Sequence, residues 1–159
     1  MSNETPNEIQ GPPGFHVMAK PVGPVCNLRC EYCFYLEKEA FFEGGAVHRM
    51  SDEVLEAYIR QVAEAHTDIP ELLFAWQGGE PTMLGIEFFE KALALQKRYA
   101  GDKPVTNTLQ TNGTLIDEGW CSFFRKYRDV VTVGISCDGP SDMHDIYRKD
   151  WKESGTFEK

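Results

Sequence analysis

Short apolar runs alternate with amphipathic helical segments along this chain, and this alternation constrains its fold more than any other feature. Residues 72–76, LLFAW, form a continuous apolar run that ends at Gly78 and Gly79, as in a strand buried on both faces. Three further runs are strand-like, at residues 15–20, 104–110 and 130–137. Because helical segments separate these runs, we predict an α/β fold with right-handed crossovers and a parallel sheet.

Three of the segments between the runs have the apolar spacing of an α-helix. Residues 51–66 begin at Ser51, an N-cap residue followed by acidic residues, and carry apolar side chains at Val54, Leu55, Tyr58, Ile59 and Val62. Residues 86–100 form a second such segment, which is closed by Gly101. Residues 117–127 form a third, with Trp120, Phe123 and Phe124 turned inward.

Polar residues follow each of the four predicted strands. The first strand is followed by a loop with three cysteines, and the others by residues 77–81, 110–113 and 136–140. Parallel sheets bind their ligands at the carboxyl ends of the strands. We therefore expect these four segments to converge on one rim that holds the functional site.

Cys26, Cys30 and Cys33 form a C-x3-C-x2-C run within eight residues, whereas Cys121 and Cys137 each stand alone. In a reducing compartment, clustered thiols are more often metal ligands or redox groups than disulfides. No fourth Cys or His follows at the spacing of a structural zinc site. Three thiolates can instead hold a [4Fe–4S] cluster and leave one iron open for chemistry.

Other interpretations of the three cysteines stay open from the residues alone. They could be small core residues, or Cys30 and Cys33 could form a thioredoxin-like redox pair. Zinc could bind with a distant fourth ligand, for which His16 and His48 are the nearest histidines. A redox pair leaves Cys26 unexplained, whereas the cluster uses all three thiols.

The cysteine spacing after a first strand resembles the signature of the radical S-adenosylmethionine (SAM) enzymes. The resemblance implies that the α/β fold is the N-terminal part of a partial (β/α)6 barrel with parallel strands. It also implies that Cys26, Cys30 and Cys33 hold a [4Fe–4S] cluster whose free iron binds S-adenosyl-L-methionine and whose electron cleaves it to a 5′-deoxyadenosyl radical. The cofactor then carries the difficult chemistry.

The same resemblance assigns the polar strand ends to the cofactor. Gly78, Gly79 and Glu80 resemble the family's second-strand motif, which binds the methionine amino group through backbone and carboxylate. Ser136 and Asp138 resemble its ribose contacts, although either residue could cap a turn instead. The rest of the predicted cofactor site comprises Tyr32, Gln77 and Asn112, of which Asn112 is also a strong turn former.

Four longer segments resemble the anaerobic sulfatase-maturating enzymes and their peptide-modifying relatives, namely CNLRCEYCFYLEK, FAWQGGEPTMLG, LQTNGTLI and ISCDGPSDMHDIYR. This resemblance, over residues 15–157, implies oxidation of a sulfatase Cys or Ser to Cα-formylglycine by hydrogen abstraction from its Cβ. It implies a sulfatase or other peptide substrate and an electron donor such as flavodoxin or ferredoxin. The alternatives are a different peptide-modifying maturase and a non-catalytic iron–sulfur or zinc-binding module.

The later barrel strands of the family pattern, and its cysteine-rich C-terminal domain with auxiliary clusters, are expected to be absent from this chain. Four strands cannot close a barrel, so we expect residues 15–159 to form an incomplete core with an open edge and an uncovered apolar face. We expect residues 1–14 to be a flexible leader. The catalytic base is expected to lie outside the chain, which alone should then cleave SAM slowly at most and make no formylglycine. Cys121 and Cys137 are expected to be buried or lining thiols, and the expected surface or loop residues are His48, His66, His144 and Arg148.

Composition bears on whether the chain binds nucleic acid or membranes and on its cellular compartment. The net charge of −9 opposes binding to phosphate backbones, so we expect no nucleic-acid partner. No apolar stretch approaches the ~20 residues that a bilayer requires, and the N-terminus has no signal-peptide pattern. We therefore expect a cytoplasmic protein with no membrane partner.

Overall fold

The computed structural model describes residues 14–41 and 49–159 of the chain. Nearly all of the predicted leader, and His48, lie outside these described residues. Four parallel strands form one open sheet in the order β1-β2-β3-β4, which confirms the predicted α/β class. The strands are β1 Met18–Ala19, β2 Leu72–Trp76, β3 Val105–Thr111 and β4 Val131–Ile135.

Helices connect the strands, as the alternation predicts. The α-helices are α1 Asp52–Ala65, α2 Ile86–Tyr99, α3 Glu118–Lys126 and α4 Ser141–Tyr147, and the 3-10 helices are η1 Leu36–Phe41 and η3 Pro81–Leu84. Ser51 caps α1 by accepting a hydrogen bond from the Val54 N–H, as predicted. Asp117 caps α3 in the same way, through the Trp120 N–H. The first three helices therefore begin and end within two residues of their predicted bounds.

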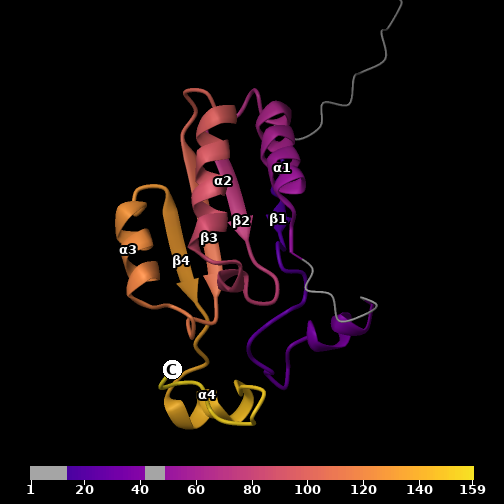
Figure 1. Cartoon of the computed structure of the whole chain (residues 1–159), viewed down its shortest axis with the longest axis vertical. Coiled ribbons are helices and arrows are strands. Elements are labelled where there is room, and N and C mark those ends of the chain that lie inside the picture. The colour runs from indigo at the N-terminus through magenta and orange to yellow at the C-terminus, as the bar shows by residue number, and fades with distance from the viewer. Residues whose placement is uncertain (1–13, 42–48) are drawn as a thin grey trace, which may run out of the picture.

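The hydrophobic core lies on one face of the sheet, where α1, α2 and α3 cover it (Figure 1). Trp76 of β2 is buried at its centre and packs edge-to-face against Tyr58 of α1 and Phe89 of α2. Its Nε1–H donates to Asn107 Oδ1 of β3 at 2.8 Å. The indole therefore fixes the helices and the neighbouring strand together at the middle of the sheet.

The opposite face of the sheet is open and mostly polar, so the expectation of an uncovered apolar face is wrong. Alternation along β3 turns Asn107, Leu109 and Thr111 toward the helices and leaves Thr108 and Gln110 exposed. In the parallel register, Thr132 of β4 lies beside Thr108 and is also exposed. Among the described strand residues, the large exposed apolar side chains of this face are Met18 and Leu73, which lie on its β1–β2 side.

Strand β1 is shorter than the predicted run of residues 15–20. Pro21 lacks an N–H and cannot extend the ladder, while the Phe15 carbonyl lies 2.8 Å from the ring nitrogen Nε2 of His66 instead of pairing with β2. Only Met18 and Ala19 pair with β2. The chain then leaves the sheet for the loop that carries the cysteines.

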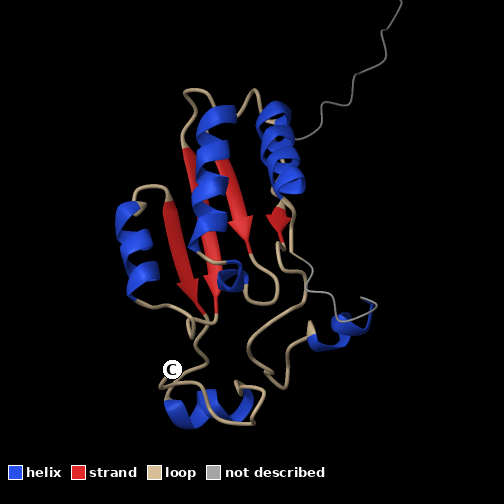
Figure 2. Cartoon of the chain, in the orientation of Figure 1, coloured by secondary structure: helices blue, strands red, loops and turns tan. Residues whose placement is uncertain are grey.

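Helix α4 and the residues after it were not predicted. They lie beyond the carboxyl ends of the strands, beside the loop that follows β1 (Figure 2). The segment SDMHDIY is short and mixes polar and apolar residues without a clear helical period. Over residues 14–41 and 49–159, the structure contains no helix of the length and apolarity needed to cross a membrane.

Candidate functional site

A pocket of about 260 Å³ opens at the carboxyl ends of the strands. From the predicted site it collects Cys26, Cys30, Cys33, Tyr32, Gln77, Gly78, Gly79, Glu80, Asn112 and Ser136. Its wall also includes Gln110 and Thr111 of the predicted rim segment 110–113, and four residues that the sequence did not single out for this site, namely Leu28, Phe34, Tyr35 and Arg148. The four polar segments therefore meet at one rim, as parallel strands require.

The cysteine loop presents its thiols to this pocket in a partly desolvated setting. Burial raises the pKa of the Cys26 thiol to about 11, and burial also raises the pKa of Cys30. The Leu28 N–H and the Asn112 Nδ2 contact Cys26 Sγ at 3.3 Å and 3.6 Å. These two thiols are therefore protonated at neutral pH in the metal-free chain, and a bound metal would displace their protons.

The Gly78-Gly79 turn brings the end of β2 against the stem of the cysteine loop. The Gly79 N–H donates to the Gly23 carbonyl at 2.8 Å, and the Glu80 N–H donates to the Val25 carbonyl at 2.8 Å. Gly78 has φ of +127°, and a Cβ at Gly79 would overlap the Val25 carbonyl. The glycines are therefore required by this close approach between two segments of the chain.

The carboxylate of Glu80 is buried and joins the ends of β2 and β3. Oε1 accepts from the Thr111 hydroxyl at 2.7 Å, from the Thr82 hydroxyl at 2.5 Å and from the Thr82 N–H at 3.0 Å. Oε2 accepts from the Asn112 N–H at 2.8 Å. Oε1 is therefore fully used within the chain, whereas Oε2 has a second lone pair.

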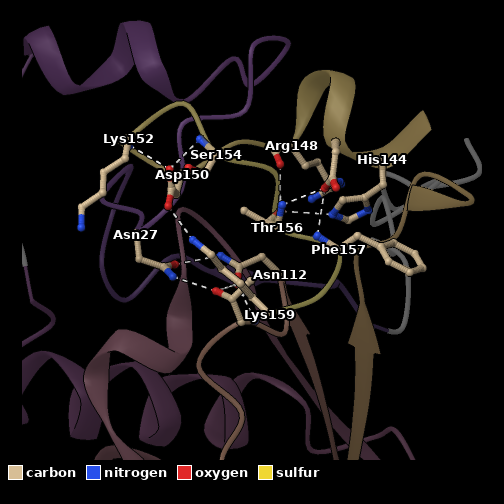
Figure 3. A network of polar contacts seen from close by, with 12 residues as sticks. Asn27, Asn112, His144, Arg148, Asp150, Lys152, Ser154, Thr156, Phe157 and Lys159 are labelled. Atoms are coloured by element: carbon tan, nitrogen blue, oxygen red, sulfur yellow. Dashed lines mark hydrogen bonds and ion pairs between the residues drawn. The ribbon is translucent and has the colours of Figure 1, made fainter. Parts of the chain in front are cut away.

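Asn112 links the end of β3 to the cysteine loop (Figure 3). Its Nδ2 donates to Asn27 Oδ1 at 2.8 Å, and its Oδ1 accepts from the Thr114 hydroxyl at 2.8 Å. Asn27 in turn donates to the Thr114 hydroxyl at 2.8 Å. The residue is thus both the turn former and a wall of the pocket.

Ser136 follows β4 and faces the pocket from its far side. Its hydroxyl accepts a hydrogen bond from Gln110 Nε2 at 3.0 Å, and its backbone N–H donates to the Thr111 carbonyl. Gln77 follows β2 and donates its backbone N–H to the Ala19 carbonyl at 3.0 Å. The side chains of Ser136 and Gln77 therefore project from strand ends whose backbone is fixed by hydrogen bonds to the neighbouring strand.

Asp138 differs from the other predicted site residues, because it is absent from the described pocket wall and instead holds two residues of that wall. It accepts from the Tyr32 hydroxyl at 2.5 Å and from Arg148 Nε at 2.8 Å. Burial alone would raise the Asp138 pKa, but the hydrogen bonds from Tyr32 and Arg148 outweigh it, and the pKa is lowered.

Arg148 corrects the prediction of a solvated loop arginine. Its side chain is 15% exposed, and its guanidinium lies 5.6 Å from the centre of the Tyr32 ring. The sequence shows only an Arg ten residues after Asp138. The short helix α4, which lies between these two residues and brings Arg148 back to Asp138, was itself not predicted.

Two histidines and two cysteines also differ from expectation. His66 and His144 are buried rather than exposed. His66 Nδ1 lies 2.7 Å from the Val62 carbonyl, and His144 Nε2 lies 3.2 Å from the Thr156 hydroxyl. Cys121 and Cys137 are exposed rather than buried. Over the described ranges, no three or more His, Cys, Asp and Glu side chains gather closely enough to hold a single metal ion.

The family model described as the Radical SAM superfamily matches residues 21–159. A serine-type anaerobic sulfatase-maturating enzyme of Bacteroides thetaiotaomicron is 47% identical over 144 residues, which are 91% of this chain and 34% of that protein. A cysteine-type anaerobic sulfatase-maturating enzyme of Clostridium perfringens is 41% identical over 151 residues, 92% of this chain and 39% of that protein.

A solved structure described as "Native anSMEcpe with bound AdoMet and Cp18Cys peptide" superimposes with a TM-score of 0.75 at 41% identity. The match covers 87% of this chain and 36% of that one. A second structure, "Native anSMEcpe with bound AdoMet", gives the same TM-score at 42% identity, again over 87% of this chain and 36% of that one. The chain thus spans a little more than a third of the length of these relatives.

Proposed function

Because the chain belongs to the radical SAM superfamily, we propose that it supplies the cluster- and cofactor-binding part of an enzyme that oxidises a sulfatase Cys or Ser to Cα-formylglycine. The observation that supports this proposal best is that Cys26, Cys30 and Cys33 face one pocket together with the ends of all four strands. The relatives of both the serine type and the cysteine type supply the substrate class. We extend that class to this chain as a proposal, since the chain covers only part of their length.

The three thiols suit an iron–sulfur cluster better than a single metal ion. A four-iron cluster is held by thiolates that stand farther apart than the ligands of one ion, and the described residues offer no closed single-ion site. Cys26, Cys30 and Cys33 share one pocket wall, so each can reach a cluster placed inside it. When bound, the cluster supplies the one electron that cleaves SAM to a 5′-deoxyadenosyl radical.

The rest of the pocket wall suits the polar parts of SAM. The free lone pair of Glu80 Oε2 can accept the methionine ammonium beside the backbone of Gly78 and Gly79. The Ser136 hydroxyl on the far side can bind the ribose, as can Gln77 and Asn112 at neighbouring strand ends.

Tyr32 supplies an exposed aromatic ring to the same wall, fixed through its hydroxyl by Asp138. Asp138 serves the cofactor in this proposal by positioning Tyr32 and Arg148. The family resemblance instead implies a direct ribose contact for Asp138, and the two roles differ in whether Asp138→Asn weakens SAM binding more than Tyr32→Phe does.

The substrate is a sulfatase peptide in this proposal, and the hydrogen taken from it comes from the side-chain Cβ of the target residue. Reduction of the cluster requires a one-electron donor, such as a flavodoxin or ferredoxin, in the cytoplasm. A peptide-modifying maturase with another target is the competing assignment, because this proposal assigns the described lining of the pocket to the cluster and the cofactor and none of it to the peptide.

A chimera tests the function directly. This chain would replace the matching third of the Bacteroides thetaiotaomicron enzyme, and the reconstituted chimera would be incubated anaerobically with SAM, a reductant and a peptide bearing the sulfatase motif. We expect mass spectrometry to show the loss of two hydrogens at the target Ser, and no conversion by the chimera with Cys30→Ala. SAM cleavage without peptide conversion would support the cofactor role of this chain but not its fit to a sulfatase-maturating enzyme, whereas the absence of both reactions would contradict the proposed role of this chain.

A further inference from the structure

The segment that follows α4 runs antiparallel along the cysteine loop. The Arg29 N–H donates to the Lys149 carbonyl at 2.7 Å, and the Glu31 N–H donates to the Tyr147 carbonyl at 3.0 Å. Leu28 and Asp150 form an antiparallel bridge at the next position. Arg29 and Glu31 are the two neighbours of Cys30, so these bonds fix the backbone on both sides of the central cysteine.

Side chains of the same segment contact the first cysteine and the flanks of the loop. Trp151 Nε1 donates to the Cys26 carbonyl at 3.1 Å. Lys149 pairs with Glu31 at 2.9 Å, and Arg29 pairs with Glu153 at 2.6 Å. These ion pairs are exposed and contribute little, whereas the hydrogen bonds to backbone groups constrain where the loop lies.

A separate network of hydrogen bonds holds the segment that follows α4 in place (Figure 3). Asp145 of α4 accepts from the Thr156 N–H at 2.7 Å and from the Phe157 N–H at 2.9 Å. The Thr156 hydroxyl donates to the Arg148 carbonyl at 2.8 Å. The described hydrophobic core and the residues packed against it end at Val131, so this network can be altered without touching the core.

We propose that residues 147–153 form a clamp that positions the thiols of Cys26 and Cys30 for the cluster. This inference rests on the proposed function, because it assumes that these thiols bind the cluster. A loop held at three backbone groups, the Arg29 and Glu31 N–H and the Cys26 carbonyl, presents its ligands in one arrangement before any iron binds, which lowers the ordering cost of binding. Trp151 is the positioning residue at Cys26, and Asp145 acts at longer range by holding the clamp closed.

Amide hydrogen exchange of the iron-free chain tests the clamp without the cluster. In Asp145→Ala, we expect the Arg29 and Glu31 amides to exchange about tenfold faster or more, because their acceptors become mobile. Asp142→Ala is the matched control, since Asp142 is exposed on the same helix and bonds to no other described side chain. Unchanged exchange at Arg29 and Glu31 in Asp145→Ala, with the helix and sheet signals of circular dichroism retained, would show that the segment does not hold the loop.

Iron release from the anaerobically reconstituted chain tests whether the clamp positions the thiols. We expect a chelator to remove iron about two- to tenfold faster from Trp151→Phe and from Asp145→Ala than from the wild type or Asp142→Ala. Iron loss at the wild-type rate in both variants, despite faster exchange at Arg29 and Glu31, would overturn the positioning role. A wild-type chain that binds no iron would instead contradict the proposed function, and the exchange measurement would still report on the clamp.

Discussion

The buried carboxylate of Glu80 accepts a hydrogen bond from the backbone N–H of Asn112 at 2.8 Å, which joins the segments that follow two neighbouring strands. The same carboxylate accepts from the hydroxyls of Thr82 and Thr111. Glu80, which resembles a cofactor contact in the sequence, therefore also holds together the segments that follow β2 and β3. Substitutions at this position affect both the fold and the site.

Glu80→Gln should lower the stability of the iron-free chain by about 1–3 kcal/mol, because one acceptor oxygen becomes an NH2 group that faces donors. Urea unfolding followed by circular dichroism measures this change. In the reconstituted chain, SAM affinity should fall about tenfold to a hundredfold while the iron content is retained, since a charge-assisted hydrogen bond is lost. Unchanged SAM affinity would remove Glu80 from the cofactor site and leave it a structural residue.

Gly79→Ala should destabilise the chain by about 1–3 kcal/mol, because the new Cβ overlaps the Val25 carbonyl and forces the β2 turn away from the cysteine loop. Gly119→Ala in α3 is the control, since its Cβ would lie 3.1 Å from a side-chain oxygen of Asp117 and alanine favours a helix. Urea midpoints of the two variants give the comparison. Equal midpoints would mean that the close approach at Gly79 is not required.

The carboxyl group of Asp138 should titrate below the ordinary value of 3.8, because Tyr32 and Arg148 donate hydrogen bonds to its charged form. His144 and Cys30 are the other titratable groups near this set. The stabilisation from this lowered pKa is complete above pH 3.8 and is lost as the pH falls through the folded value.

Carbon-13 NMR of the iron-free chain follows the Asp138 titration directly. The Tyr32→Phe variant should raise the midpoint toward the ordinary value, since one of the two donors is removed. A wild-type midpoint at or above 3.8 would show that the ion pair and the Tyr32 hydrogen bond do not form in solution.

The 159-residue chain alone should cleave SAM slowly and make no formylglycine. The open face of its sheet and the free side of β4 admit water, which a radical reaction must exclude. Incubation with SAM, a reductant and the sulfatase-motif peptide, followed by mass spectrometry of the peptide, checks this expectation. Conversion of the peptide by the isolated chain would mean that these residues suffice for the whole reaction.

The sequence predicted those elements whose pattern is strong and local. LLFAW is β2 residue for residue, and Ser51 and Asp117 cap their helices because short polar side chains at these positions satisfy free N–H groups. The rim was predictable for a topological reason, since parallel strands gather their carboxyl ends at one edge. The cysteine spacing, together with the family resemblance, then led to the proposal that this edge holds a [4Fe–4S] cluster.

What the sequence did not reveal depends on contacts between distant segments. Arg148 and His144 look like loop residues until α4 folds back against the cysteine loop, and no local pattern marks that return. His66 is buried because the carbonyls of Val62 and Phe15 lie beside its ring. The polar open face of the sheet was not predicted, because the strands of a parallel sheet were expected to be apolar on both faces. Strand β3 instead alternates exposed Thr and Gln with its core residues.

The iron content of the anaerobically reconstituted chain tests the central claim most directly. We expect about four irons per chain with the brown absorption of a [4Fe–4S] cluster, lost in Cys26→Ala, Cys30→Ala and Cys33→Ala, and retained in Cys121→Ala and Cys137→Ala. A colourless protein that binds zinc, or a cluster that survives removal of any of the first three thiols in a folded chain, would contradict the account.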